Sequence, residues 1–118
     1  MKRGELELLD YAIYFATKAH NGQKRKSDKE VDMIFHPYTV AMMIQRSGGT
    51  DNAVIAGLLH DVVEDTKYTL EDIINEFGED IANIVSEVSE KKELEWGPLE
   101  LKFRILISKK SLITSIYM

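Results

Sequence analysis

The sequence contains no cysteine. Disulfides, zinc–thiolate sites and cysteine nucleophiles are therefore excluded, and any metal site must use histidine, aspartate and glutamate. No apolar run approaches the roughly 18 residues of a membrane span, and the N-terminal MKRGELELLD lacks the apolar stretch of a signal peptide. These absences predict a cytoplasmic protein with no membrane partner.

Glycine and proline are scarce, and positive charge is not in excess. The 118 residues include seven glycines and two prolines, and the net charge is −5. Such a chain is not built as a whole to bind nucleic acid, so its basic residues must be judged by position. Its length and its 44% of apolar residues are those of a single globular domain, which we place at residues 1–118.

Helical periodicity dominates the chain. Residues 5–19 predict an amphipathic helix, whereas residues 20–33 are charged, aperiodic and typical of a loop. Pro37 suits the first turn of a second helix, which Gly48 and Gly49 end. The apolar face of the first helix is expected to consist of Leu6, Leu9, Ala12, Ile13, Ala16 and Ala19.

Three further helices complete the prediction. Asp51 can cap a helix over residues 52–65, NAVIAGLLHDVVED, which is apolar nearly all round and therefore expected at the centre of the domain. Thr69, followed by Glu71 and Asp72, resembles a capping box for residues 70–77, and Gly78 ends that helix. The last helix, residues 79–90, aligns Ile81, Ile84, Val85 and Val88. No segment alternates like a strand, so the predicted fold class is all-α.

The residues that follow Trp96 differ in character. Residues 97–118 are rich in β-branched and basic side chains and carry no acid beyond Glu100. A helix packed on the domain is one prediction, and their high β-propensity allows another. An exposed tail of this kind would favour a homo-oligomer.

The stretch GLLHDVVEDT, residues 57–66, places ionisable groups in an apolar segment. On a helix, His60 shares a face with Glu64, and Asp61 with Asp65, so the four can line one pocket. A buried imidazole beside a buried carboxylate is costly unless a divalent cation compensates. The alternative is a hydrogen-bonded surface pair, which is the commoner state of an isolated HD dipeptide.

A second imidazole strengthens the metal hypothesis. His36 is flanked by apolar residues in MIFHPYTV and would come from a different helix. Glu64 and Asp65 would then be available to orient or deprotonate an attacking water. Their alternative role is simple solvation at a helix C-terminus, although acids there oppose the helix dipole.

Four segments together resemble the HD-superfamily hydrolase domain of Rel/SpoT proteins and the small alarmone hydrolases. The segments are AHNGQKRKS, FHP, LLHDVVEDT and FGEDIANIVSEVS, and they follow one another with compatible spacing over roughly residues 5–96. This resemblance implies a compact helical HD-domain bundle.

The resemblance also implies roles for single residues. The metal ligands would be His36, His60 and Asp61, with Mn²⁺ the family's usual ion and another divalent cation the alternative. Glu64 and Asp65 match the acidic pair that activates or positions the attacking water. The residues facing the guanine and ribose end of the nucleotide would be Arg25, Lys26 and Ser27, a segment that on its own would predict only a solvated basic loop. His20 and Gln23 match as well, and a capping or structural role for His20 is an equal alternative.

The activity that the resemblance implies is removal of the 3′-pyrophosphate from ppGpp or pppGpp, which yields GDP or GTP. Two alternatives are an HD phosphohydrolase acting on another nucleotide and a non-catalytic alarmone-binding or regulatory remnant. A synthetase role is not expected, because the chain is too short to contain the family's separate synthetase domain.

The sequence departs from the family pattern in two places. The loop between Ser27 and His36 is longer than the family's common spacing and lacks its glycine and proline. Family members also close the metal shell with a later aspartate in a segment resembling ADKLHN, and nothing after Trp96 resembles it. A divergent or truncated tail over residues 97–118 would weaken metal binding.

Overall fold

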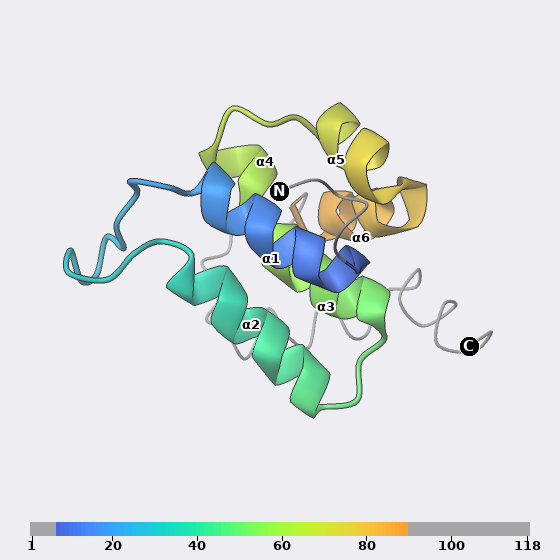
Figure 1. The fold of residues 1–118 in the computed structure, drawn as a ribbon, viewed down its shortest axis with the longest axis horizontal. Coiled ribbons are helices and arrows are strands. Elements are labelled where there is room, and N and C mark those ends of the chain that lie inside the picture. The colour runs from blue at the N-terminus through green and yellow to red at the C-terminus, as the bar shows by residue number, and fades with distance from the viewer. Residues whose placement is uncertain (1–6, 90–118) are drawn as a thin grey trace.

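The computed structural model describes residues 7–89 of the chain, and these fold into helices (Figure 1). Five helices have eight residues or more, and a sixth is a single turn; no strand is present between residues 7 and 89. The all-α prediction is therefore confirmed. The predictions for Leu6 and for the tail after Trp96 lie outside the described residues. The elements are α1 (Leu8–Ala19), α2 (Phe35–Arg46), α3 (Asp51–Leu59), α4 (Val62–Asp65), α5 (Leu70–Phe77) and α6 (Glu79–Ser89).

Helix α3 forms the centre of the domain, as its uniformly apolar sequence predicts. Every residue from Ala53 to Leu59 is buried, and α3 packs against α1, α2 and α6. In Figure 1, α1 crosses in front of α3, whereas α2 and the α5–α6 pair lie on different sides. Fully burying a Val, Leu or Ile side chain contributes about 1.5–3 kcal/mol, so this helix anchors the segments that flank it.

Helix α1 buries a face that is rotated from the predicted one. Its buried residues are Tyr11, Ala12, Phe15 and Ala16, whereas Leu9 and Ile13 are only partly buried. The reason is aromatic packing. The centroid of the Phe15 ring lies 5.4 Å from that of Phe77 in α5, edge to face, and 4.7 Å from that of Tyr68. The aromatic rings, rather than the aliphatic stripe, therefore join α1 to the second half of the domain.

The capping predictions succeed at α5 and fail at α3. Thr69 and Asp72 form the predicted capping box, and Gly78 ends α5 with φ +94°. The prediction that Asp51 caps α3 is wrong, because Thr50 holds that place and its hydroxyl accepts a hydrogen bond from the Ala53 amide. Thr50 has the extended backbone that a cap requires, and Asp51 instead lies in the first turn, where its charge suits the helix dipole.

No helix among the described residues combines the length and the apolar character that a membrane crossing requires. The long connection between α1 and α2 projects from the helical body (Figure 1) and contains an isolated antiparallel bridge between Lys24 and Asp32. The side chains of these two residues also form an ion pair.

Candidate metal centre

The histidine and aspartate of the HD pair interrupt a helix. The prediction of one continuous helix over residues 52–65 is wrong, because α3 ends at Leu59 and α4 begins at Val62. The His60 Nδ1–H donates to the carbonyl of Gly57 at 2.6 Å. In an unbroken helix that carbonyl would accept the amide of Asp61, so the imidazole competes with the backbone for this acceptor and a turn forms.

The structure brings His36, His60 and Asp61 together. The Nε2 atoms of His36 and His60 are 3.3 Å apart, and Asp61 Oδ2 lies 3.1 Å from His60 Nε2 and 3.7 Å from His36 Nε2. His36 belongs to the first turn of α2, and the other two form the turn between α3 and α4. The packing of α2 on α3 thus makes the atoms of the three side chains converge.

The hydrogen bond to Gly57 fixes the tautomer that the His60 ring adopts when it is neutral. A carbonyl oxygen can only accept, so Nδ1 carries the proton and Nε2 of the neutral ring presents a lone pair. That lone pair and the Asp61 carboxylate are both acceptors, and they face each other while His60 and Asp61 are only 6% and 5% exposed. A proton or a cation is therefore required among these atoms, since two buried acceptors in contact repel.

A divalent cation fits this set of donors. Two ligand atoms about 2.1 Å from one cation are about 3.0 Å apart at a right angle and about 3.4 Å apart at the tetrahedral angle. Two of the observed separations, 3.1 and 3.3 Å, lie between these values, and the third, 3.7 Å, is slightly longer than the tetrahedral one. The backbone carbonyl that orients His60 through its second ring nitrogen is also the usual partner of a metal-binding histidine.

The acidic pair Glu64 and Asp65 follows the His36–His60–Asp61 cluster by one helical turn of the chain. Glu64 and Asp65 are both exposed and belong to α4, the single turn that follows Asp61. The amide of Asp65 donates to the carbonyl of Asp61 at 2.9 Å. Asp61 and Asp65 are therefore still one helical turn apart, as predicted, although the helix is broken before Asp61. The two acids therefore follow Asp61 by one helical turn along the chain.

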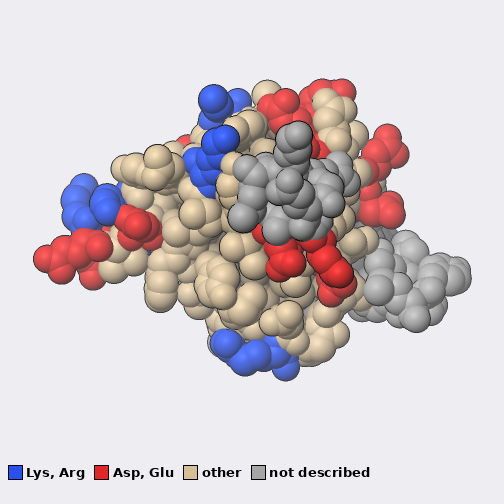
Figure 2. Space-filling model, viewed as in Figure 1, with Lys and Arg blue, Asp and Glu red and all other residues tan. Residues whose placement is uncertain are grey.

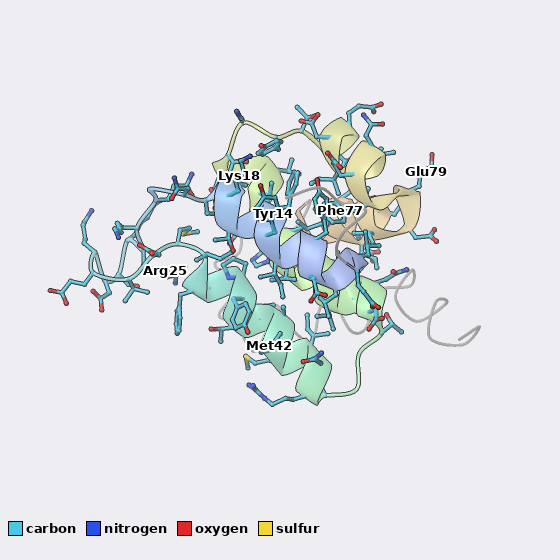
Figure 3. The ribbon with its side chains drawn as sticks, in the orientation of Figure 1. Tyr14, Lys18, Arg25, Met42, Phe77 and Glu79 are labelled. Carbon is cyan, nitrogen blue, oxygen red and sulfur yellow. The ribbon has the colours of Figure 1, made fainter. Side chains whose placement is uncertain are left out.

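The basic segment Arg25, Lys26 and Ser27 belongs to the projecting loop. Arg25 is partly buried and its amide donates to the carbonyl of Val31 at 2.8 Å, whereas Lys26 and Ser27 are exposed. Figure 3 labels Arg25 on this loop, away from Phe77 and Glu79 at the α5–α6 side. Figure 2 shows that acidic side chains accompany the basic ones at the projecting end, so this end is not a purely basic patch.

No role for Gly57 was predicted, yet its carbonyl accepts the hydrogen bond that orients the His60 ring. A Cβ at this position would lie 2.9 Å from Ile44 Cδ1 and 3.3 Å from the Cα of Ala41 in α2. A signal was present in the sequence, since an isolated glycine inside a helix often marks the close approach of another element.

The chain is similar in sequence to proteins of one family. Residues 12–97 match a family model described as HD domain. The guanosine-3′,5′-bis(diphosphate) 3′-pyrophosphohydrolase MESH1 of Xenopus tropicalis is 47% identical over 85 residues, which cover 70% of this chain and 48% of that protein. The guanosine-3′,5′-bis(diphosphate) 3′-pyrophosphohydrolase of Haemophilus influenzae is 44% identical over 81 residues, covering 69% of this chain and 12% of that protein.

A solved structure agrees with these relatives. It belongs to a metazoan ortholog of SpoT that hydrolyses ppGpp, and it matches with a TM-score of 0.68 and 32% identity over 76% of this chain and 52% of that one. The chain thus spans about half the length of MESH1 and a smaller share of the bacterial relative.

Proposed function

Because this chain belongs to the HD domain family, and within it to the SpoT, Rel and MESH1 type, we propose that it hydrolyses the 3′-pyrophosphate of ppGpp and pppGpp. The products would be GDP and GTP. The observation that carries the proposal is the convergence of two imidazoles and one carboxylate from two parts of the fold, α2 and the turn between α3 and α4, with His60 Nε2 and Asp61 Oδ2 only 3.1 Å apart.

His36, His60 and Asp61 would hold the cation, for which we propose Mn²⁺. Imidazole and carboxylate ligands suit several divalent ions, so the choice of manganese rests on the family resemblance. When bound, such a cation supplies positive charge that polarises a phosphoryl oxygen and acidifies water. The later aspartate predicted from the family would fall outside the described residues, and its absence stays a prediction.

One of the exposed carboxylates of α4 would act as the general base. The oxygen of water bonds to the phosphorus attached to the ribose O3′, the bond between that phosphorus and O3′ breaks, and pyrophosphate leaves. Glu64 or Asp65 accepts the proton that the water loses, and the ribose O3′ takes up a proton to become a hydroxyl. No covalent nucleophile is needed, in keeping with a chain that has no cysteine.

The loop that carries Arg25, Lys26 and Ser27 would receive the guanosine end of the substrate. The Lys24–Asp32 ion pair and the hydrogen bond between the Arg25 amide and the Val31 carbonyl hold the two sides of this loop together. Such a framework would keep the basic side chains in place for a nucleotide, because loops positioned by a rigid scaffold commonly bind ligands. The cytoplasmic location and the homo-oligomer remain predictions.

The test is hydrolysis of ppGpp by the purified chain with and without Mn²⁺, with GDP and pyrophosphate measured by anion-exchange chromatography. Glu64→Gln should retain manganese and lower kcat by about a hundredfold, a typical contribution of a general base. If the wild-type chain converts deoxynucleoside triphosphates faster than ppGpp, the substrate is another nucleotide. If the chain binds ppGpp tightly without turnover, it is a non-catalytic binding module.

A further inference from the structure

Gln23 joins two segments that are far apart in the sequence. Its side-chain amide donates to the carbonyl oxygen of Asp65 at 2.7 Å, across 42 positions of the chain. Its other side-chain atom, Oε1, lies 2.9 Å from Nδ1 of His20. Because the NH₂ group is directed to the Asp65 carbonyl, Oε1 is the acceptor in the second contact and His20 Nδ1 carries the proton.

His20 is buried at the C-terminal end of α1, where it makes this contact. The residue is 2% exposed, and its backbone amide donates to the Ala16 carbonyl at the end of α1. With the proton on Nδ1, Nε2 is a buried acceptor, and it has no hydrogen-bond partner among the described residues. An apolar side chain at position 20 would avoid the cost of a buried acceptor without a partner. What the imidazole provides in return is the Nδ1–H donor to Gln23.

The Asp65 peptide is held from both sides. Its amide donates to the carbonyl of Asp61, and its carbonyl accepts from Gln23. Helix α4 has only four residues, and a single turn with two acids at its end has little stability of its own. The hydrogen bond from Gln23 satisfies one of the carbonyls that such a helix end leaves without an intrahelical donor.

We propose that Gln23, oriented by His20, is a positioning residue that fixes the end of α4 and with it the acidic pair Glu64 and Asp65, one helical turn after Asp61. Gln23 also begins the segment that continues into Arg25, so the same side chain couples the loop proposed to bind the nucleotide to the carboxylates proposed to act on water. The inference rests on the proposed function for its catalytic consequence. Its structural part, the fixing of the end of α4, stands on the hydrogen bonds alone.

Gln23→Glu tests the proposal with little change in shape. A carboxylate can still accept from His20, but it cannot donate to the Asp65 carbonyl. We expect kcat for Mn²⁺-dependent ppGpp hydrolysis to fall at least about tenfold, while KM and the Kd for Mn²⁺ stay within about threefold. Gln45→Glu is the matched control, because Gln45 is exposed on α2 and the change in charge is the same; it should behave like the wild type.

A second measurement does not depend on activity. The amides of Asp65 and Thr66 donate within α4, to the carbonyls of Asp61 and Val62. In Gln23→Glu their hydrogen exchange, followed by NMR, should accelerate by at least about tenfold, with α3 and α6 unchanged.

Substitutions of His20 provide a rescue comparison. Asparagine can place an N–H where Nδ1 lies, whereas glutamine places its N–H nearer to Nε2. His20→Asn should therefore keep kcat and the exchange rates close to the wild type, and His20→Gln should resemble Gln23→Glu. This pair also decides the question if Gln23→Glu does not fold.

The outcomes separate the two proposals. If kcat and exchange in Gln23→Glu equal those of the wild type, or if Mn²⁺ affinity, melting temperature and kcat all fall together, the positioning role is refuted. If the wild-type chain does not hydrolyse ppGpp, the proposed function fails. In that case faster exchange confined to Asp65 and Thr66 still supports the positioning of the acidic pair, and unchanged exchange overturns it.

Discussion

Replacing Gly57 with alanine inserts a methyl group at a close contact between α3 and α2. The new Cβ would lie 2.9 Å from Ile44 Cδ1 and 3.3 Å from the Cα of Ala41. The first contact is with the end of a side chain and can be relieved by rotation, but the second is with backbone. The two helices must therefore separate by a few tenths of an ångström, and these helices position His36 and His60.

The expected cost can be weighed against the gain in helix propensity. Alanine is favoured over glycine inside a helix by about 1 kcal/mol, whereas overpacking a tight core costs about 1–3 kcal/mol. We expect a net loss of about 1 kcal/mol in the free energy of unfolding, which lowers Tm by about 4 °C for a domain of this size. Asn83→Ala is the control, because Asn83 is exposed on α6 and should only gain propensity.

Urea unfolding of a double-mutant cycle measures the contact itself. Ile44→Val removes the Cδ1 atom and alone should cost about 1 kcal/mol. In the Gly57→Ala background it should cost at least about 0.5 kcal/mol less, because the same atom causes part of the clash. A Gly57→Ala protein that is more stable than the wild type would refute the close approach of α2 and α3 at this position.

Two further predictions concern stability, each measured by urea unfolding. Thr69→Ala removes the hydroxyl that accepts the Asp72 amide and should destabilise the domain by about 1 kcal/mol, whereas an unchanged midpoint would show that the capping box contributes nothing. Tyr11→Phe removes the hydrogen bond from its hydroxyl to Glu76 Oε2, 3.2 Å long and partly buried, and should cost about 0.5–1 kcal/mol; a larger loss would indicate that the ring itself has moved.

The parts of the fold that could be predicted are those that local sequence decides. Helix α3 is recognisable because its run of apolar residues has only one stable place, at the centre. The capping box at Thr69 and the glycine at position 78 act within one turn of the chain. These features need no knowledge of which other element will pack nearby.

The parts that could not be predicted depend on tertiary contacts. The buried face of α1 differs from the predicted one because Phe15 packs against Phe77 and Tyr68. The predicted helix at residues 52–65 is broken because the His60 imidazole donates to the carbonyl of Gly57. Neither event leaves a periodic signal.

The candidate site was predicted in part. His36, His60 and Asp61 converge, whereas their metal-binding role and the roles of Glu64 and Asp65 remain predictions. The hydrogen bond from Gln23 to Asp65 spans 42 positions and could be found only in three dimensions.

The proposed function depends most on the binding of one cation by two imidazoles. Electron–nuclear double resonance of the Mn²⁺-loaded chain measures this directly, since nitrogen ligands couple to the manganese spin. We predict nitrogen couplings from two histidines, with His36→Ala and His60→Ala each removing one. A manganese spectrum with no histidine nitrogen coupling, or one that both substitutions leave unchanged, would contradict the metal centre and the function proposed from it.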